Sequence, residues 1–199
     1  MRVLLAVVVV LLGGCSKSGI PKTELGADGP RGLWWAETKL DAKRRGILVQ
    51  AYFPGGVLVS QPKLLSGSRI NMEADRGTYQ VKDAQLHRQI GDVDSTDPFE
   101  TGTDDLGRWF LAEARYRPLN RASRTLLTGQ WISKRDRSKL VLLDDDPSWK
   151  LDGYQLTTSA KSGLCGMTDE GRVIFDGQLY ITAAPNAFEQ EFDNGMRLP

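Results

Sequence analysis

The sequence contains few of the residues that usually form metal sites and nucleophilic sites. Its 199 residues include one histidine, His87, and two cysteines, Cys15 and Cys165. A structural zinc site normally takes four nitrogen or sulfur ligands, which these residues do not supply. His87 with Cys165 is the one composition open to a histidine-based catalytic site, and no protease signature surrounds this cysteine. We therefore expect no enzyme, no metal and no cofactor, with Cys165 as a buried, inert thiol.

An excess of charge of either sign is also missing. The chain has 26 Lys and Arg residues against 25 Asp and Glu residues, a net charge of +1. Domains dedicated to nucleic acid usually carry a strong basic excess, so this balance argues against a nucleic-acid partner. Long amphipathic helices are not expected either, because no apolar stripe with helical spacing continues over several turns.

The one long apolar run, Val3 to Leu12, follows a single charge at Arg2. A helix that crosses a bilayer needs roughly 20 apolar residues, about twice the length of this run. A short basic start, a brief apolar stretch and small residues before a cleavage site are typical of a secretion signal. We therefore interpret residues 1–14 as a signal peptide.

The residues that end this run, Leu12-Gly13-Gly14-Cys15, resemble the lipobox of bacterial lipoproteins. The resemblance implies that Cys15 becomes the first mature residue and carries lipid, such as palmitate, on its sulfur and its amine. Several acyl chains hold a protein far more firmly than one chain, which binds a membrane only marginally. Ser16 follows in place of the Asp that marks inner-membrane retention, which implies the periplasmic face of the outer membrane. The alternative is an ordinary signal peptide with an incidental cysteine.

Composition divides the rest of the chain into a tether and one domain. Residues 15–30 contain three glycines, two prolines and few large apolar groups. Such a composition does not support a packed element, so we expect a flexible tether there. Residues 31–199 are enough for one compact domain and too few for two ordinary ones.

Short apolar or alternating runs follow one another along this domain, separated by turn residues, as is typical of an all-β protein. Pro54-Gly55-Gly56 predicts a tight hairpin, because Pro fixes φ and Gly accepts positive φ. Closing the sheet removes its unpaired edges, so we favour an antiparallel β-barrel or a barrel-like meander. We predict strands over residues 32–38, 46–53, 57–60, 77–81, 84–89, 108–117, 125–133, 139–143, 153–158, 172–175 and 178–182.

Three segments resemble the lipocalin-like pattern: Gly32-Leu33-Trp34, residues 52–56 and residues 77–81. In that pattern a Gly-x-Trp triplet opens the first strand, and the resemblance implies a lipocalin-like barrel. A second triplet, Gly129-Gln130-Trp131, indicates a degenerate repeat in which the β unit is used twice. The tryptophan of each triplet fits a core position.

Acidic residues gather at two places, residues 92–105 and Asp144-Asp145-Asp146. Oxygen-rich loops bind calcium in some proteins, but the spacing of an EF-hand is absent. We interpret the first stretch as a solvated loop and the second as a turn that ends a strand, with calcium binding as the alternative.

A basic stretch covers residues 108–139, with nine Lys or Arg residues against two acidic ones. Such a stripe attracts the phosphates of a membrane surface or an acidic partner. We assign this anionic-surface binding to Arg115, Arg117, Arg121 and Arg124. The alternative is that these residues are the outward positions of two neighbouring strands and their loop.

Alternation along the predicted strand over residues 108–117 places Phe110 and Tyr116 on one face, and Trp109 and Glu113 on the other. Small barrels hold one ligand when their interior side chains leave room, and we expect Trp109, Phe110 and Tyr116 to line such a cavity. The sequence therefore favours a membrane-anchored, non-enzymatic envelope lipoprotein that binds an apolar ligand or another envelope protein. The alternative is a structural or assembly component that has a filled interior and acts through its surface.

Overall fold

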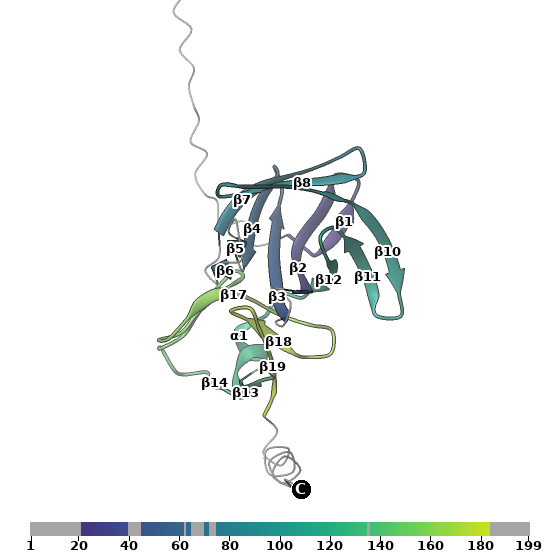
Figure 1. Ribbon diagram of the computed structural model, residues 1–199. Helices are drawn as coiled ribbons and strands as arrows, with labels where there is room; N and C mark the ends of the chain where they lie inside the picture. The colour runs from purple at the N-terminus through teal and green to yellow at the C-terminus, as the bar shows by residue number, and fades with distance from the viewer. Residues whose placement is uncertain are drawn as a thin grey trace, which may run out of the picture.

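The computed structural model describes residues 21–39, 45–61, 63–64, 70–71, 75–134 and 136–183 (Figure 1). Nearly all of the regular structure in these residues is antiparallel strand, which confirms the predicted all-β, barrel-like fold. The strands form two large sheets and a short hairpin of β5 (Lys63–Leu64) with β6 (Ile70–Asn71). No helix among the described residues is long and apolar enough to cross a bilayer.

The first sheet closes on itself. Apart from the β5–β6 hairpin and the pair β9 and β10, strands that are consecutive in sequence are neighbours in this sheet, and β12 returns to pair with β2, where Pro118 lies opposite Trp34. The two ends of the sheet, β9 and β10, are separated in the chain only by Phe99, so this residue joins them and completes the ring. Within the described residues its strands are β1 (Glu24–Gly26), β2 (Gly29–Lys39), β3 (Arg45–Phe53), β4 (Val57–Gln61), β7 (Asp75–Lys82), β8 (Gln85–Ile90), β9 (Val93–Pro98), β10 (Glu100–Asp104), β11 (Gly107–Leu111) and β12 (Arg115–Leu119).

The second sheet repeats this plan on a smaller scale. Consecutive strands pair except β14 and β15, and β19 returns to β13, where Thr182 lies opposite Trp131. Its ends, β14 and β15, again follow each other in the chain, and the intervening loop packs closely because the Trp149 indole donates to the Leu143 carbonyl at 2.7 Å. This part of the described chain contains α1 (Arg124–Leu127), β13 (Gly129–Ser133), β14 (Lys139–Leu142), β15 (Lys150–Asp152), β16 (Gln155–Thr157), β17 (Ser162–Met167), β18 (Val173–Phe175) and β19 (Gln178–Thr182).

A tryptophan of a Gly-x-Trp triplet lies in each sheet on the strand that pairs with the last strand: Trp34 on β2 and Trp131 on β13. Trp34 and Trp131 are 1% and 4% exposed, which confirms their predicted core positions. The indole of Trp34 donates to the Arg31 carbonyl at 2.9 Å, and that of Trp131 donates to the Leu127 carbonyl at 2.8 Å. The two sheets therefore share a strand plan and a tryptophan whose indole donates to a backbone carbonyl three or four residues earlier in the chain.

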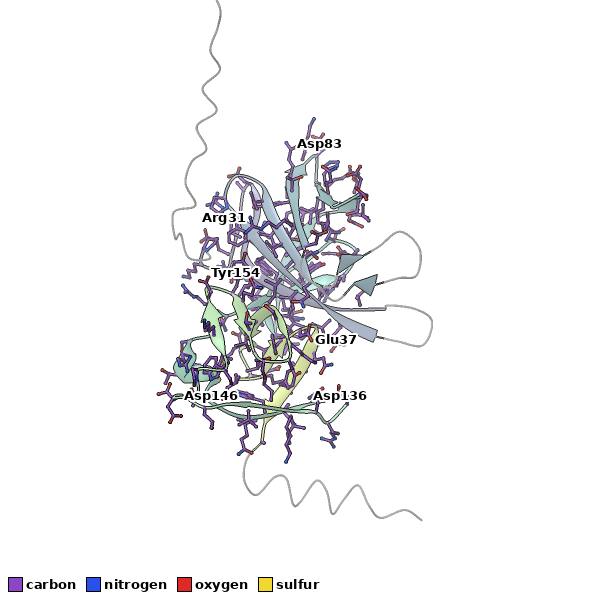
Figure 2. All side chains as sticks on the ribbon, turned by 90° about the vertical axis from the view of Figure 1, so that its left-hand side faces the viewer. Arg31, Glu37, Asp83, Asp136, Asp146 and Tyr154 are labelled. Carbon is purple, nitrogen blue, oxygen red and sulfur yellow. The ribbon has the colours of Figure 1, made fainter. Side chains whose placement is uncertain are left out.

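The two sheets pack with their outer faces together. The buried cluster between them consists of Leu33, Val49, Ala51, Val59, Leu119, Leu164 and Ile174. Gln61 adds a polar link, because its Oε1 accepts a hydrogen bond from the backbone N–H of Leu164 at 2.6 Å. Figure 2 shows Tyr154 near this junction, whereas Asp136 and Asp146 lie at the far end of the second sheet.

The prediction of one strand over residues 108–117 is wrong. The chain reverses at residues 112–114, where the Ala112 N–H donates to the Ala114 carbonyl at 3.0 Å. β11 and β12 therefore form a hairpin, with Phe110 opposite Tyr116. The reversal contains Ala-Glu-Ala and no Gly or Pro, so the apolar alternation continued through it without a turn signal.

The predicted strand over residues 125–133 is also divided. Its first part is the helical turn α1, and β13 begins only at Gly129. Ser123 caps the helix, because its side chain accepts a hydrogen bond from the Leu126 N–H at 3.2 Å. A single serine cap is a short signal that a strand pattern easily hides.

Strands also occupy two segments for which we expected none. Within the predicted tether, residues 15–30, β1 begins at Glu24 and β2 at Gly29, so the chain is already paired before Arg31. The acidic residues 92–105, expected as a solvated loop, form β9, β10 and the turns beside them. The side chains of β9 alternate between half-buried and exposed, so Asp94 reaches solvent, whereas Asp97 is half-buried.

Candidate functional site

The interior of the first sheet is where the sequence predicted an apolar ligand. Phe110 and Tyr116 are completely buried there, and their rings stack with centroids 4.7 Å apart and planes 9° apart. Trp34 and Tyr52 meet the Phe110 ring edge-on, with centroids 5.0 Å and 5.9 Å away. Four buried aromatic rings thus occupy the interior.

Trp109 does not belong to this group. It alternates with Phe110 along β11, so it lies on the outer face, where it is half-buried. The guanidinium carbon of Arg115 lies 4.4 Å from the centre of its ring. The structure therefore brings Phe110 and Tyr116 together but separates them from Trp109, because neighbouring residues of a strand point to opposite faces.

A charged group lies next to the aromatic rings, and we call it the Arg88 cluster. Its members are Gln50, Tyr52, Arg88, Asp97, Glu113 and Tyr116. Arg88 is 5% exposed and donates to Asp97 at 2.6 Å and to Glu113 at 2.7 Å. Tyr116 donates to Glu113 at 2.5 Å, and Tyr52 donates to Gln50 at the same distance. One buried cation thus faces two carboxylates, and both carboxylates accept hydrogen bonds from side chains of the cluster.

Electrostatics fix the protonation states of Arg88 and of the two tyrosines in this cluster. Burial, reinforced by the charge of Glu113, raises the pKa of Tyr116 well above its usual range. Burial also raises the pKa of Tyr52, although the charge of Arg88 opposes this shift. Burial disfavours the charge on Arg88, but the contacts with Tyr52 and Glu113 outweigh that effect and raise its pKa. At neutral pH the arginine is charged and both phenols are neutral, so these three side chains act as fixed hydrogen-bond donors inside the barrel.

The sequence contained one signal for this cluster that we did not use. Arg88 alternates with Leu86 and Ile90 along β8, so a period of two places it on the core face. Glu113 was predicted to lie with Trp109 on the face opposite Phe110 and Tyr116. The reversal at residues 112–114 instead leaves its carboxylate facing Arg88.

His87 and Cys165 lie in different sheets. Cys165 is 1% exposed inside the second sheet, and burial raises the pKa of its thiol to about 12. His87 is half-buried on the outer face of β8, where its Nδ1 lies 3.0 Å from the Thr96 hydroxyl. A buried neutral thiol is a poor nucleophile, so this pair does not form a catalytic site.

Three of the four arginines predicted to bind an anionic surface have acceptors within the protein. Arg117 donates to both carboxylate oxygens of Asp104, at 2.9 Å and 2.7 Å, and Arg115 lies 3.6 Å from the same carboxylate. Arg124 stacks over the Trp149 ring at 3.9 Å and donates to the Asp144 carbonyl at 2.6 Å. Arg121 is exposed and forms no ion pair with any residue that the structure describes.

The acidic residues do not converge. Among the described residues, no group of three or more His, Cys, Asp or Glu side chains is arranged to hold a metal ion. Asp104 is paired with Arg117, which together with the Leu106 N–H holds its pKa below the usual range. The Asp146 carboxylate accepts from the Ser148 N–H at 2.7 Å, as a turn residue does.

A hollow of about 470 Å³ lies on the outer face of the first sheet, and we call it the β7–β9 groove. The glycines of the β3–β4 turn form one wall; both have positive φ, +80° at Gly55 and +76° at Gly56, as the predicted hairpin requires. The floor consists of two rows of side chains on three adjacent strands: Gln80, His87 and Thr96 in one row, and Thr78, Gln89 and Asp94 in the other. The sequence analysis did not identify this groove, because it depends on the register of three strands.

The groove and the Arg88 cluster lie on opposite faces of the same strands. Arg88 and Tyr79 alternate with the groove residues along β8 and β7, so their side chains point toward the interior. The groove is therefore the open surface of this part of the barrel, and the cluster lies on its inner side.

Compared with known protein families, with characterised proteins and with solved structures, the chain has no match.

Proposed function

We propose that this protein is a non-enzymatic lipoprotein of the cell envelope that is anchored through lipid on Cys15 and acts through its outer surface. The single observation that supports action through the surface is the packing of both interiors. In the first sheet the buried rings and the Arg88 cluster occupy the centre. In the second sheet Trp131, Trp149 and Phe175 do the same.

Interior binding of an apolar ligand has less support. A ligand-binding barrel needs an empty volume, and protein interiors without one resist insertion because their side chains are close-packed. A ligand that entered the first sheet would displace stacked rings and break hydrogen bonds to Glu113. We therefore favour a component that binds glycan or protein partners of the envelope at its surface.

A probe of the interior tests the packed core. The lipidated chain is extracted in mild detergent, titrated with benzene and followed by NMR. The Phe110→Ala variant is the positive control. Removing a buried ring leaves an apolar cavity of the kind that binds benzene. We expect saturable binding only in the variant. Saturable binding by the unaltered chain, or a lipid-sized mass that co-purifies in native mass spectrometry, would overturn action through the surface alone.

Labelling with a palmitate analogue in a bacterial host tests the anchor. Cys15 lies outside the described residues, and its role rests on the lipobox resemblance. We expect Cys15→Ser to abolish the label and Cys165→Ser to retain it, because the second thiol is buried. Undiminished labelling of Cys15→Ser would refute lipidation at this position. Fractionation of the labelled chain then separates inner-membrane from outer-membrane anchoring.

A further inference from the structure

We propose that the β7–β9 groove binds an uncharged glycan chain. Four of the six floor side chains have no partner within the described residues, whereas His87 and Thr96 bind each other at 3.0 Å. Thr78, Gln80, Gln89 and Asp94 are exposed, and none of their side chains forms a hydrogen bond or ion pair with any residue in the described part of the chain. By contrast, most polar side chains of the barrel interior are paired, as those of the Arg88 cluster show.

The spacing of these groups suits an extended, repetitive ligand. Thr78 lies opposite Gln89, which lies opposite Asp94, and Gln80, His87 and Thr96 form the parallel row. Neighbouring strands are about 4.8 Å apart, and side chains two positions apart on a strand are about 6.6 Å apart. The floor is thus a small grid of donors and acceptors held on a rigid sheet, with the Gly55–Gly56 turn beside it.

The chemistry of the grid selects a neutral ligand rich in hydroxyl groups. Each glutamine amide offers two donors and an acceptor, and each threonine hydroxyl donates and accepts. A sugar hydroxyl also does both, so it satisfies such groups in either orientation. Asp94 disfavours anions, and the guanidinium of Arg88, the one cation whose residue borders the groove, is bound to Asp97 and Glu113 on the interior face.

A peptide or protein ligand fits this surface less well. Extended peptides usually bind at a sheet edge, where they continue the backbone hydrogen bonds, whereas the groove lies on a sheet face. Protein interfaces depend on buried aromatic or arginine anchors, and the exposed floor of the groove has neither. Oligosaccharides, in contrast, bind to the strand faces of other small barrels. A volume of about 470 Å³ also lies within the usual range for ligand sites.

The residues that line the groove all belong to the first sheet; its Gly55 wall lies near the second sheet, because the ring of Phe53 is 5.3 Å from that of Tyr154, whereas Figure 2 shows the β7–β8 turn pointing away from that sheet. Asp83, in the turn that joins β7 to β8, lies at the end of the molecule opposite Asp136 and Asp146. The outer faces that pack the two sheets together belong instead to other strands, chiefly β2, β3 and β17. The assembly of the two sheets therefore leaves the groove open.

Calorimetric titration tests the proposal with the full lipidated chain in zwitterionic micelles, which contain no sugar. The probes are three neutral tetrasaccharides: cellotetraose, maltotetraose and tetra-N-acetylchitotetraose. We expect saturable binding of at least one. The double variant Gln80→Ala with Gln89→Ala removes four donors and two acceptors, and we expect it to weaken binding about tenfold or more. Thr78→Val is expected to weaken it several-fold.

Gln85→Ala is the matched control, because Gln85 is an exposed glutamine of β8 that does not line the groove. We expect it to retain the affinity of the unaltered chain, and all variants to keep its urea midpoint. Absence of saturable binding to all three sugars, or undiminished binding in both groove variants, would overturn the proposal. The inference rests on the surface-acting function proposed above, but its failure is distinct, because the palmitate and benzene tests do not involve the groove.

Discussion

Arg88 and Glu113 come from β8 and from the β11–β12 turn, and they meet inside the first sheet with Nη1 and Oε1 2.7 Å apart. Removing one partner from a buried ion pair leaves the other charge without compensation, at a cost of about 3–5 kcal/mol. We therefore expect Arg88→Met to lower the free energy of unfolding by about this amount, as measured by urea denaturation. Arg108→Met, at an exposed position of β11, should change it by less than about 0.5 kcal/mol. Equal effects of the two substitutions would contradict a structural role for the cluster.

The stacked rings of Phe110 and Tyr116 give a second prediction. Phe110→Ala removes a completely buried ring, and such changes cost about 3–5 kcal/mol. Thermal or urea unfolding measures the loss. Leu106→Ala is the control, because Leu106 is 63% exposed at the tip of the β10–β11 hairpin and should tolerate truncation within about 0.5 kcal/mol. A Phe110→Ala variant as stable as the control would mean that the interior is not packed as described.

Cys165 makes the stability of the protein sensitive to alkaline pH. Burial raises the pKa of its thiol from 9.0 to about 12 in the folded state. Below pH 9.0 both states carry the neutral thiol and its stabilising contribution is complete. Above that pH the unfolded thiol ionises first, so the free energy of unfolding falls by about 1.4 kcal/mol per pH unit until the folded thiol also ionises.

Comparison with Cys165→Ala isolates this effect from the tyrosines, which also ionise in that range. We expect the stability of the unaltered chain to fall more steeply than that of the variant between about pH 9 and about pH 10.5. Parallel curves in urea denaturation would show that the thiol is accessible. Reaction with a thiol reagent at neutral pH should likewise be slow before unfolding and complete after it.

Gln61 couples the two sheets, since its Oε1 accepts from the backbone of Leu164 at 2.6 Å. Gln61→Leu leaves a buried N–H without an acceptor, which costs about 1–3 kcal/mol. We expect the loss to appear as earlier unfolding in urea and as faster amide exchange at Leu164. Gln130→Leu changes an exposed glutamine of β13 and serves as the control. If amide exchange at Leu164 were the same in both variants, the Gln61 contact would not hold the sheets together.

Local signals in the sequence predicted much of the strand content. Turn chemistry located the hairpin at Gly55 and Gly56, and both residues have the positive φ that the prediction required. Alternation located β7, β8 and β19, because half-buried strands repeat with a period of two. The reversal between Ala112 and Ala114 was missed, since its composition carries no turn signal.

The candidate site was harder to predict, because it depends on register between strands that are distant in sequence. Arg88 meets Glu113 only after the sheet has curled, and Gln80 aligns with Thr96 only through His87. Nothing local fixes these pairings. The basic stretch was likewise predicted to be free for ligands, but Arg117 and Arg124 bind groups that the fold brings to them.

The pairing of the first and last strands also sets the order in which the two sheets can fold. β12 must pair with β2 before Trp34 is enclosed, and β19 must pair with β13 before Trp131 is enclosed. The last pairing to form in each sheet therefore joins the strands that are farthest apart in sequence. Contacts between residues distant in sequence form slowly, because the entropy cost of closing the long loop arises before the contact stabilises the chain. Every strand of the first sheet precedes every strand of the second in the chain. A chain synthesised from its N-terminus can therefore fold the first sheet while the second is still incomplete. The leucines and valines on the outer face of the first sheet then form an apolar surface against which the second sheet can fold.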